Sequence, residues 1–435
     1  MPECRRALDP ETAGREMHAL IESLFPICRS LTGPGVRQTL AVLQQHIPLE
    51  IREVPTGTRV LDWTIPREWT IRDAWIKNAA GERVVDFRRS NLHVVGYSMP
   101  VHRRLSLAEL RPHLHSLPDH PDWIPYRTSY YNEDWGFCLT HRQLASLPHG
   151  EYEVMIDASL EDGHLTYGEY HLAGEREEEV LISTHACHPS LGNDNLSGVA
   201  VATALARLLG AARLRYSYRF LFVPATLGSI TWLAQHPEAA TRVRHGLVLA
   251  CVGDRGPATY KRSRRGDAQI DRAASHALHH AGVAGRIEPF SPWGYDERQY
   301  CSPGFDLPVG CLMRTPYGRF PEYHTSADDL AFVDPAALAD TLGLCLQALA
   351  VLEGDAVYRN LSPYGEPQLG RRGLFDPSAG RAASPQRELA LLWVLSYSDG
   401  AHALLDIAEL SGLPFDVVRE AADRLAASGL LELVG

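Results

Sequence analysis

Two histidines and an aspartate within ten positions, His185, His188 and Asp194, are well suited to metal chemistry. They follow an apolar stretch, residues 180–184, that predicts a buried strand, and they precede an apolar stretch, about 196–209, that predicts a helix. An open α/β sheet builds its sites in such polar loops, at the carboxyl ends of its strands. Because zinc prefers imidazole nitrogen and carboxylate oxygen, this loop predicts a metal site.

Three more polar groups lie in loops, mostly just after predicted strands. Asp254 follows one of these strands. Asp296 and Glu297 lie in a Tyr-Asp-Glu-Arg sequence, and His324 lies in a Tyr-His-Thr-Ser sequence. The stretch 193–195 could be a turn and a helix cap, and the stretch 324–328 could be another cap, but strand ends converge on one crevice, so we expect the groups to meet. Asp194 is placed to bridge two ions, which in two-metal sites lie about 3.5–4 Å apart.

The elements that must position these residues alternate along the chain from about 166 to 353. The predicted strands are 180–184, 218–223, 246–252 and 307–313, and the predicted helices are 196–209, 230–235, 270–281 and 335–352. Such alternation favours an α/β fold with a mainly parallel mixed sheet and flanking helices.

The hydrophobic pattern divides the chain into several parts. Residues 1–48 and 166–353 form the predicted α/β domain. Residues 49–165 carry short β-like stretches and many aromatic residues, which predicts an inserted β-rich domain. Residues 354–384 are rich in glycine, proline and arginine and predict a linker. Residues 385–435 hold three helical stretches and a final apolar stretch, which predicts a winged-helix domain.

The composition narrows the function classes. A chain of 435 residues, 45% apolar and 22% charged, can bury a large core in two or three domains. The net charge of −11 disfavours binding to nucleic acid or to an anionic membrane. The eight cysteines form no CxxC pair, and we find neither a signal sequence nor an apolar stretch of membrane-spanning length. We therefore expect a cytoplasmic protein with reduced thiols.

The sequence from His185 to Ala200, with its Asp-Asn-x-Ser-Gly element, resembles the zinc aminopeptidase superfamily that includes the M28 peptidases. More closely, nearly the whole chain resembles the DUF4910 family of aminopeptidase-like proteins, which carry an inserted DUF2172-type domain and a C-terminal winged helix. The motifs that carry this resemblance begin at Trp63, Asn91, Tyr130, Asp296 and Arg314.

The resemblance implies one or two zinc ions, with ligands at His185, Asp194, Asp254 and His324. His188 is a competing or additional ligand, because the superfamily motif is usually His-x-Asp and position 187 is a cysteine here. The choice between His185 and His188 stays open.

One position departs from the family pattern. Where the close family usually has Pro-Glu-Thr-x-Gly-Ser, this chain has Pro-Ala-Thr-Leu-Gly-Ser, with Ala225 in place of the glutamate. Alanine can neither accept a proton nor bind a metal, and loss of a general base costs about 10²–10⁴ in rate. Either the site is impaired, or another carboxylate is the catalytic base, for which Asp296 and Glu297 are the candidates.

Other residues are candidates for binding a substrate. Arg298 and Arg314 could hold a carboxylate with the guanidinium fork, or they could pair with Asp296 or Glu322. Tyr317 and Tyr323 could line the pocket or pack in the core. These alternatives stay open.

The leading hypothesis is a zinc-dependent, aminopeptidase-like hydrolase that cleaves an amide bond of a small amino-acyl, peptide or amino-sugar conjugate. One alternative is a catalytically weakened protein that binds a metal and a ligand or acts as a scaffold. Another is a DNA-binding regulator with a metabolite-sensing α/β domain. From Arg381 to Gly435 the chain has four arginines, no lysine and eight acidic residues, so we expect the winged helix to pack or to form a homo-oligomer rather than to bind nucleic acid.

Overall fold

The computed structural model describes residues 9–130, 132–282, 285–374 and 385–434. Its centre is an eight-stranded sheet in the order β1-β10-β12-β11-β13-β16-β14-β15. In that order the strands are β1 (Glu50–Pro55), β10 (His164–Leu172), β12 (Ser217–Val223), β11 (Glu179–His185), β13 (Val243–Leu249), β16 (Val309–Met313), β14 (Ala258–Lys261) and β15 (Gly285–Glu288). The central strands β12, β11, β13 and β16 are parallel, whereas β1, β10 and the β16–β14 pair are antiparallel. The predicted α/β fold with a mainly parallel mixed sheet is confirmed.

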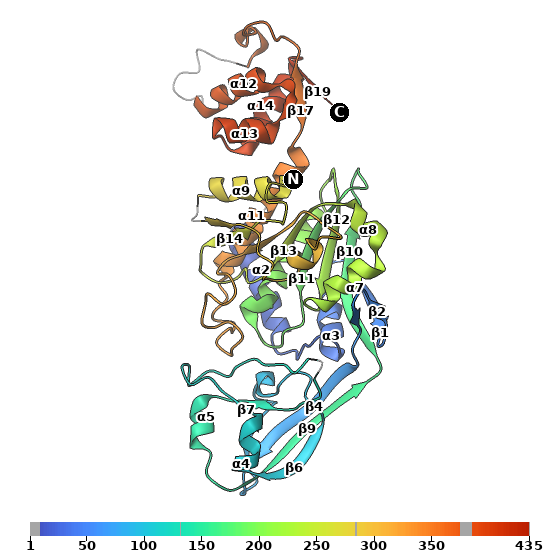
Figure 1. Cartoon of the computed structure of the whole chain (residues 1–435). Coiled ribbons are helices and arrows are strands. Elements are labelled where there is room, and N and C mark those ends of the chain that lie inside the picture. Colours follow the sequence, from blue (N-terminus) through green and yellow to red (C-terminus); the bar gives the residue numbers. More distant parts are fainter. Residues whose placement is uncertain (1–8, 131, 283–284, 375–384, 435) are drawn as a thin grey trace.

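Helices cover both faces of this sheet (Figure 1). One face packs against α2 (Pro10–Leu24), α3 (Pro34–Leu43), α6 (Gly198–Leu209), α9 (Gln269–His280) and α11 (Pro335–Gly354). The other packs against α7 (Leu227–Gln235), α8 (Pro237–Arg242) and α10 (Glu297–Tyr300). Each face of the sheet has its own hydrophobic core. Along β11, Val180 and Ile182 pack in the core of the first face, and Leu181 packs in the core of the second face. Because successive side chains of a strand point to opposite faces, a strand covered on both sides must be apolar throughout.

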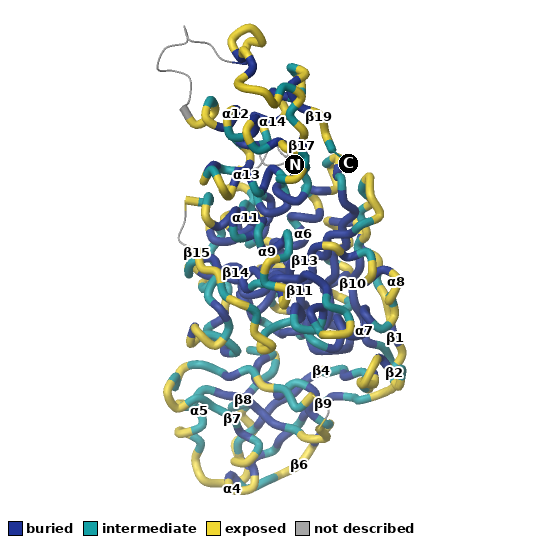
Figure 2. Tube along the Cα trace, turned by 45° about the horizontal axis from the view of Figure 1, so that its top comes forward, coloured by how far each residue is buried: buried dark blue, intermediate teal, exposed yellow. Residues whose placement is uncertain are grey.

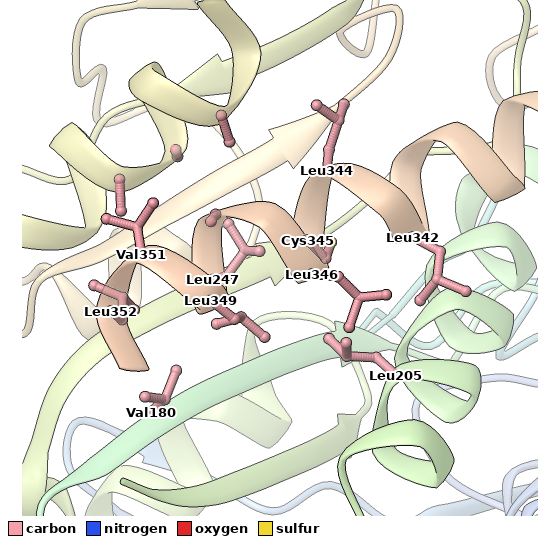
Figure 3. Packing of buried hydrophobic residues seen from close by; sticks show 14 of the residues in the cluster. Val180, Leu205, Leu247, Leu342, Leu344, Cys345, Leu346, Leu349, Val351 and Leu352 are labelled. Atoms are coloured by element: carbon pink, nitrogen blue, oxygen red, sulfur yellow. The ribbon is translucent and has the colours of Figure 1, made fainter. Parts of the chain in front are cut away.

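The helix α11 lies in the centre of the first core, where its leucines meet β11, β13 and α6 (Figure 3). Among the described residues it is the one helix whose length and composition would allow it to cross a membrane, although the sequence led us to expect no stretch of that length. In the structure, 67% of its most apolar window is buried inside the protein.

The inserted β-rich domain has a four-stranded antiparallel sheet in the order β5-β4-β9-β6. Its strands are β4 (Glu68–Lys77), β5 (Arg83–Asp86), β6 (Val101–Ser106) and β9 (Glu151–Glu161). The smaller elements are β2 (Arg59–Val60), β3 (Trp63–Thr64), β7 (Leu114–His115), β8 (Phe137–Cys138), α4 (Leu107–Leu110) and α5 (His141–Ser146). The predicted boundary at residue 49 needs correction, because β1 pairs with β10 along its whole length and so belongs to the main sheet.

The C-terminal domain has three helices and a three-stranded sheet, the arrangement of a winged helix. Its elements are β17 (Val357–Asn360), α12 (Pro385–Tyr397), β18 (Asp399–Ala403), α13 (Leu404–Ser411), α14 (Phe415–Ala427) and β19 (Leu431–Leu433). Because β17 is the middle strand of this sheet, the domain begins inside the predicted linker 354–384. The part of that linker at 375–384 lies outside the described residues.

The inserted domain and the winged helix lie at opposite ends of the main domain (Figure 1). Buried residues are concentrated in the main sheet and its helices, and exposed residues at the far tip of the inserted domain around α4 (Figure 2). On the winged-helix side, the backbone nitrogen of Phe415 donates to Nε2 of His276 at 3.0 Å, and Arg419 donates to the Gly354 carbonyl at 2.6 Å. The first turn of α14 is therefore docked on α9 and on the end of α11.

Candidate metal centre

Four side chains that can bind a metal ion meet at the carboxyl end of the central strands. His185 is the last residue of β11, and His188 follows in the next loop. Asp194 lies in the segment Gly192–Ser197 before α6, where its own backbone angles (φ −107°, ψ 85°) are not helical, and His324 lies between β16 and α11. His185 and Asp194 are fully buried, whereas the His324 side chain is 32% exposed. His324 is therefore the most exposed member of the group.

Asp194 lies between the histidines. Its Oδ1 is 2.9 Å from Nε2 of His185 and 4.0 Å from Nδ1 of His188, and its Oδ2 is 3.0 Å from Nε2 of His324. All three of these inward atoms are buried: among the described residues, Nδ1 of His188 has no hydrogen-bond partner, and Oδ2 of Asp194 and Nε2 of His324 have only each other. Since buried polar atoms normally have partners, their convergence indicates a place for a cation.

The protonation states also suit a cation. Burial lowers the pKa of His188 to about 3, so its imidazole is neutral at pH 7 and keeps a lone pair. Burial alone would raise the pKa of Asp194, but His188, His185 and His324 together hold this pKa well below its ordinary value. A neutral imidazole beside an ionised carboxylate is the combination that a zinc site needs.

The loop that carries Asp194 is held by hydrogen bonds from distant parts of the chain. Asp328 accepts from the backbone nitrogens of Asn193 at 2.5 Å and of Asp194 at 2.9 Å. The Asn195 side chain accepts from the backbone nitrogen of Cys251 at 3.1 Å. Such supporting contacts orient the atoms that bind a metal.

A buried arginine holds His188. Arg29, 1% exposed, donates from Nε to the His188 carbonyl at 2.8 Å and from Nη1 to the Leu24 carbonyl at 2.7 Å. Burial lowers the pKa of Arg29 to about 10, so the guanidinium stays charged at neutral pH. Sequence reasoning missed this residue, because no local pattern connects it to a loop 159 positions away.

Hydrogen bonds engage both carboxylate oxygens of Asp254, another of the predicted ligands. Its Oδ1 accepts from the backbone nitrogen of Gly256 at 2.7 Å and from Oγ1 of Thr315 at 2.6 Å. Its Oδ2 accepts from Nδ2 of Asn193 and from the backbone nitrogen of Thr315, both at 3.1 Å. With both oxygens engaged, Asp254 supports the loop beside Asp194 rather than offering a free ligand atom.

Ala225, at the position where the family usually has a glutamate, lies beside a buried thiol and near a buried carboxylate. The backbone nitrogen of Ala225 donates to Sγ of Cys187 at 3.2 Å, and burial raises the pKa of this thiol to about 12. Oδ1 of Asp296 accepts from the backbone nitrogen of Thr226 at 2.7 Å and from Oγ of Ser229 at 2.9 Å. Its Oδ2 is buried and has no partner among the described residues. Burial raises the pKa of Asp296, although nearby His185 opposes the shift.

The carboxylate of Glu297 has different surroundings from that of Asp296. Its Oε1 lies 2.6 Å from Nζ of Lys261, and the two side chains are 1% and 5% exposed. Lys261 also donates to the carbonyls of Ser291 at 3.0 Å and Trp293 at 2.8 Å. Glu297 is thus half of a buried ion pair through Oε1, and its buried Oε2, like Oδ2 of Asp296, has no hydrogen-bond partner among the described residues.

The two arginines that were predicted to bind a substrate differ in their contacts. Arg314 donates to the carbonyls of Gly256 at 2.8 Å and Ala337 at 3.2 Å and lies 3.8 Å from Asp340, so it supports the backbone. Neither of the salt bridges considered for it, to Asp296 or to Glu322, forms. Arg298 is half-buried and makes no ion pair with any described residue. It remains available for an anionic group.

Tyrosines surround the histidines. Tyr323 stacks on His324 with ring centroids 4.0 Å apart, and Tyr295 stacks on His185 at 5.0 Å. Tyr317 packs edge-on against Tyr295 at 5.1 Å. The two tyrosines expected to line the pocket or the core therefore belong to the wall of the metal centre.

The inserted domain completes this wall. The backbone nitrogen of Tyr126 donates to the His324 carbonyl at 2.8 Å, and Pro125 forms a β-bridge with Thr325. The Tyr126 ring packs edge-on against His188 at 5.3 Å and against His324 at 5.1 Å. No pattern in the sequence connects Tyr126 with His188 or His324, because it lies far from both along the chain.

This fold is that of the zinc aminopeptidases. A zinc aminopeptidase from Bacillus subtilis superposes with a TM-score of 0.58 at 12% identity, covering 79% of this chain and 95% of that one. An M28 peptidase from Shewanella amazonensis superposes with a TM-score of 0.53 at 14% identity, covering 81% of this chain and 97% of that one. At these identities the likeness concerns the fold alone.

The chain belongs to the DUF4910 family, described as a domain of unknown function, whose pattern matches residues 18–355. A winged helix-turn-helix pattern matches residues 356–433. A Clostridium acetobutylicum protein, provisionally named as a polysaccharide biosynthesis protein with an aminopeptidase-like domain, is 52% identical over 98% of this chain and 97% of its own length. A crystal structure from the same organism, provisionally described as a peptidase, has a TM-score of 0.94 at 50% identity and covers 98% of this chain and 97% of that one.

Proposed function

We propose that the protein is a zinc-dependent hydrolase that cleaves an amide bond of a small amino-acyl, peptide or amino-sugar conjugate. The observation that carries this proposal is the convergence of three histidines on the carboxylate of Asp194, with the buried Nδ1 of His188 left without a partner among the described residues. The aminopeptidase-like fold supports amide chemistry. The name of the Clostridium relative supports a substrate connected with polysaccharide synthesis.

Residues of the chain are proposed to take up the proton, to orient the substrate and to limit its size. A bound zinc ion would polarise the substrate carbonyl and acidify a water molecule. Asp296 is the proposed general base, because its Oδ2 has no partner among the described residues and burial raises its pKa above the ordinary aspartate value. Arg298 orients an anionic group of the substrate, and Tyr126 and Tyr323 limit the size of the group that reaches the histidines.

The alanine at position 225, where the family usually has a glutamate, favours a second candidate function. In this case the protein binds a metal and a ligand and hydrolyses amides slowly or not at all. Activity toward N-acyl amino sugars and amino-acid anilides separates the two candidates. Hydrolysis that depends on zinc supports the first, whereas zinc binding without hydrolysis of any of these amides supports the second.

Metal content tests both candidates. The full chain, purified after zinc supplementation, should hold at least one zinc per chain by elemental analysis, and Asp194→Asn and His188→Ala should each lose most of it. His149→Ala is the matched control, because His149 is exposed and lies outside the metal centre. Zinc far below one per chain in the unaltered protein would refute a zinc-dependent function.

A further inference from the structure

His324 lies in a long connection with little regular structure. The connection runs from residue 314 to residue 334, all of it described, and it contains neither a helix nor a named strand. His324 itself has a φ of 56°, a left-handed conformation that residues other than glycine rarely adopt. Such a conformation persists where the surrounding contacts enforce it. The position of this histidine therefore depends on what holds its backbone.

The inserted domain supplies the contacts that hold it. Residues 124–126 lie antiparallel to residues 324–326, with a β-bridge at the middle of each segment. The backbone nitrogen of Tyr126 donates to the His324 carbonyl at 2.8 Å. Among the described residues, 124–126 is the one segment outside the connection 314–334 that makes backbone–backbone hydrogen bonds to residues 324–326. The backbone on either side of His324 is therefore held by another domain.

Ser326 makes two hydrogen bonds to the same residue of the inserted domain. Its backbone nitrogen donates to the Ile124 carbonyl at 2.8 Å, and its Oγ accepts from the Ile124 nitrogen at 3.0 Å. Among the described groups, this hydroxyl is the one acceptor for the Ile124 nitrogen. Removal of the hydroxyl would leave that donor without a partner in the protein, which weakens the pairing of the two segments.

The segment that holds His324 is itself fixed in the inserted domain. Just beyond it, the Gly96 nitrogen donates to the Arg127 carbonyl at 2.9 Å, and the Gly96 carbonyl accepts from the Ser129 nitrogen at 2.9 Å. Oγ1 of Thr128 donates to the same carbonyl at 3.2 Å. A Cβ at position 96 would lie 3.3 Å from that Oγ1, so glycine permits the close approach. Residues 124–126 are therefore a firm support rather than a loose loop.

We infer that the inserted domain contributes to the metal centre: residues 124–126 hold His324 where it can bind zinc, and Ser326 is the positioning residue that joins the two segments. The inference rests on the proposed function and gives the inserted domain a role in it. The Tyr126 ring adds to this role, because it packs edge-on against His188 and His324 and so limits how their imidazoles can turn.

Competition with a chelator, on the full chain, tests the role of Ser326. We expect Ser326→Ala to bind zinc at least about tenfold more weakly than the unaltered protein, the usual effect of losing a contact that orients a ligand. Ser326→Thr keeps the hydroxyl and should restore the affinity. Ser411→Ala is the matched control, because Ser411 of the winged helix is also half-buried and its Oγ also accepts from a backbone nitrogen, that of Leu413 at 3.2 Å. It should bind zinc as the unaltered protein does.

Hydrogen exchange of the metal-free protein separates a loss of positioning from a loss of stability. In Ser326→Ala the backbone amides at positions 126 and 326 should exchange at least about tenfold faster, whereas those of β11 should keep their rates, because local opening leaves the core protected. Faster exchange throughout the chain would mean that the substitution destabilises the whole fold, and it would overturn the inference.

The affinities also distinguish this inference from the proposed function. Equal zinc affinity in Ser326→Ala and Ser411→Ala, or an affinity that Ser326→Thr does not restore, would overturn the inference and leave the proposed zinc site standing. Zinc far below one per chain in the unaltered protein would refute the proposed function and, with it, the role of Ser326.

Discussion

Nζ of Lys261 lies 2.6 Å from Oε1 of Glu297, with both side chains almost fully buried. Burial raises the pKa of Glu297, and the ammonium of Lys261 opposes that shift. A carboxylate held in this way stabilises the fold and is poorly placed to take a proton from water at the metal centre.

Glu297→Gln should therefore lower stability without removing the metal. Leaving the Lys261 charge buried and unpaired costs roughly 3–5 kcal/mol, to be measured by urea unfolding. Glu288→Gln, which breaks the more exposed pair with Arg319, should cost less than about 1 kcal/mol. Loss of zinc in Glu297→Gln would contradict the conclusion that Glu297 stabilises the fold and has no role in the metal centre.

Ala225→Glu should raise amide hydrolysis at least tenfold, because a general base contributes about 10²–10⁴ in rate. Ala225 is half-buried, and its neighbour Thr226 donates to Asp296, so the new carboxylate would lie close to the candidate base. Ala225→Gln is the matched control, since it has nearly the same size and cannot accept a proton. Equal rates for the two variants would count against a missing base.

Arg29→Met should weaken zinc binding about 10–100-fold, the usual effect of losing a contact that positions a ligand. The substitution leaves the carbonyls of His188 and Leu24 without their donor. Competition with a chelator measures the affinity, and Arg15→Met, at an exposed arginine of α2, should not change it. Unchanged affinity in Arg29→Met would show that Arg29 has only a general structural role.

The contact between the winged helix and the main domain should weaken in acid. Burial, followed by the neighbouring His280 and His279, lowers the pKa of His276 to about 4, and its Nε2 accepts a hydrogen bond from Phe415. A lowered pKa means that the unfolded state binds the proton more readily. The stabilisation is complete above about pH 6.5, the ordinary histidine value, and declines as pH falls toward 4. Urea unfolding across this range should show the loss, and His276→Gln should flatten it.

The winged helix should not bind duplex DNA. In helix-turn-helix proteins the first residues of the second helix contact base edges. Here those residues of α14 are docked on His276 and Gly354. Titration of the full chain with duplex DNA should give no binding that weakens as salt increases. Salt-sensitive binding would mean that this contact opens in solution.

Much of the fold could be predicted because its signals are local. The apolar stretch 180–184 became β11 (Glu179–His185), and the helical pattern 335–352 became α11 (Pro335–Gly354). The boundary at residue 49 was wrong because β1 looks like any short strand, and only its pairing with β10 assigns it to the main sheet.

Only part of the candidate site could be predicted, because only part of it is formed by residues that are close together in the sequence. The sequence by itself determined that His185, His188 and Asp194 lie at the end of a buried strand and in the connection that follows it, because their spacing is local. Only the tertiary structure decided that Thr315 engages Asp254 and that Lys261 pairs with Glu297.

Tertiary structure also decided that Tyr126 of the inserted domain reaches His324. Hydrophobic periodicity specifies which face of a strand or helix is buried. Which distant polar group meets another depends on how those faces pack together, and no local pattern records it.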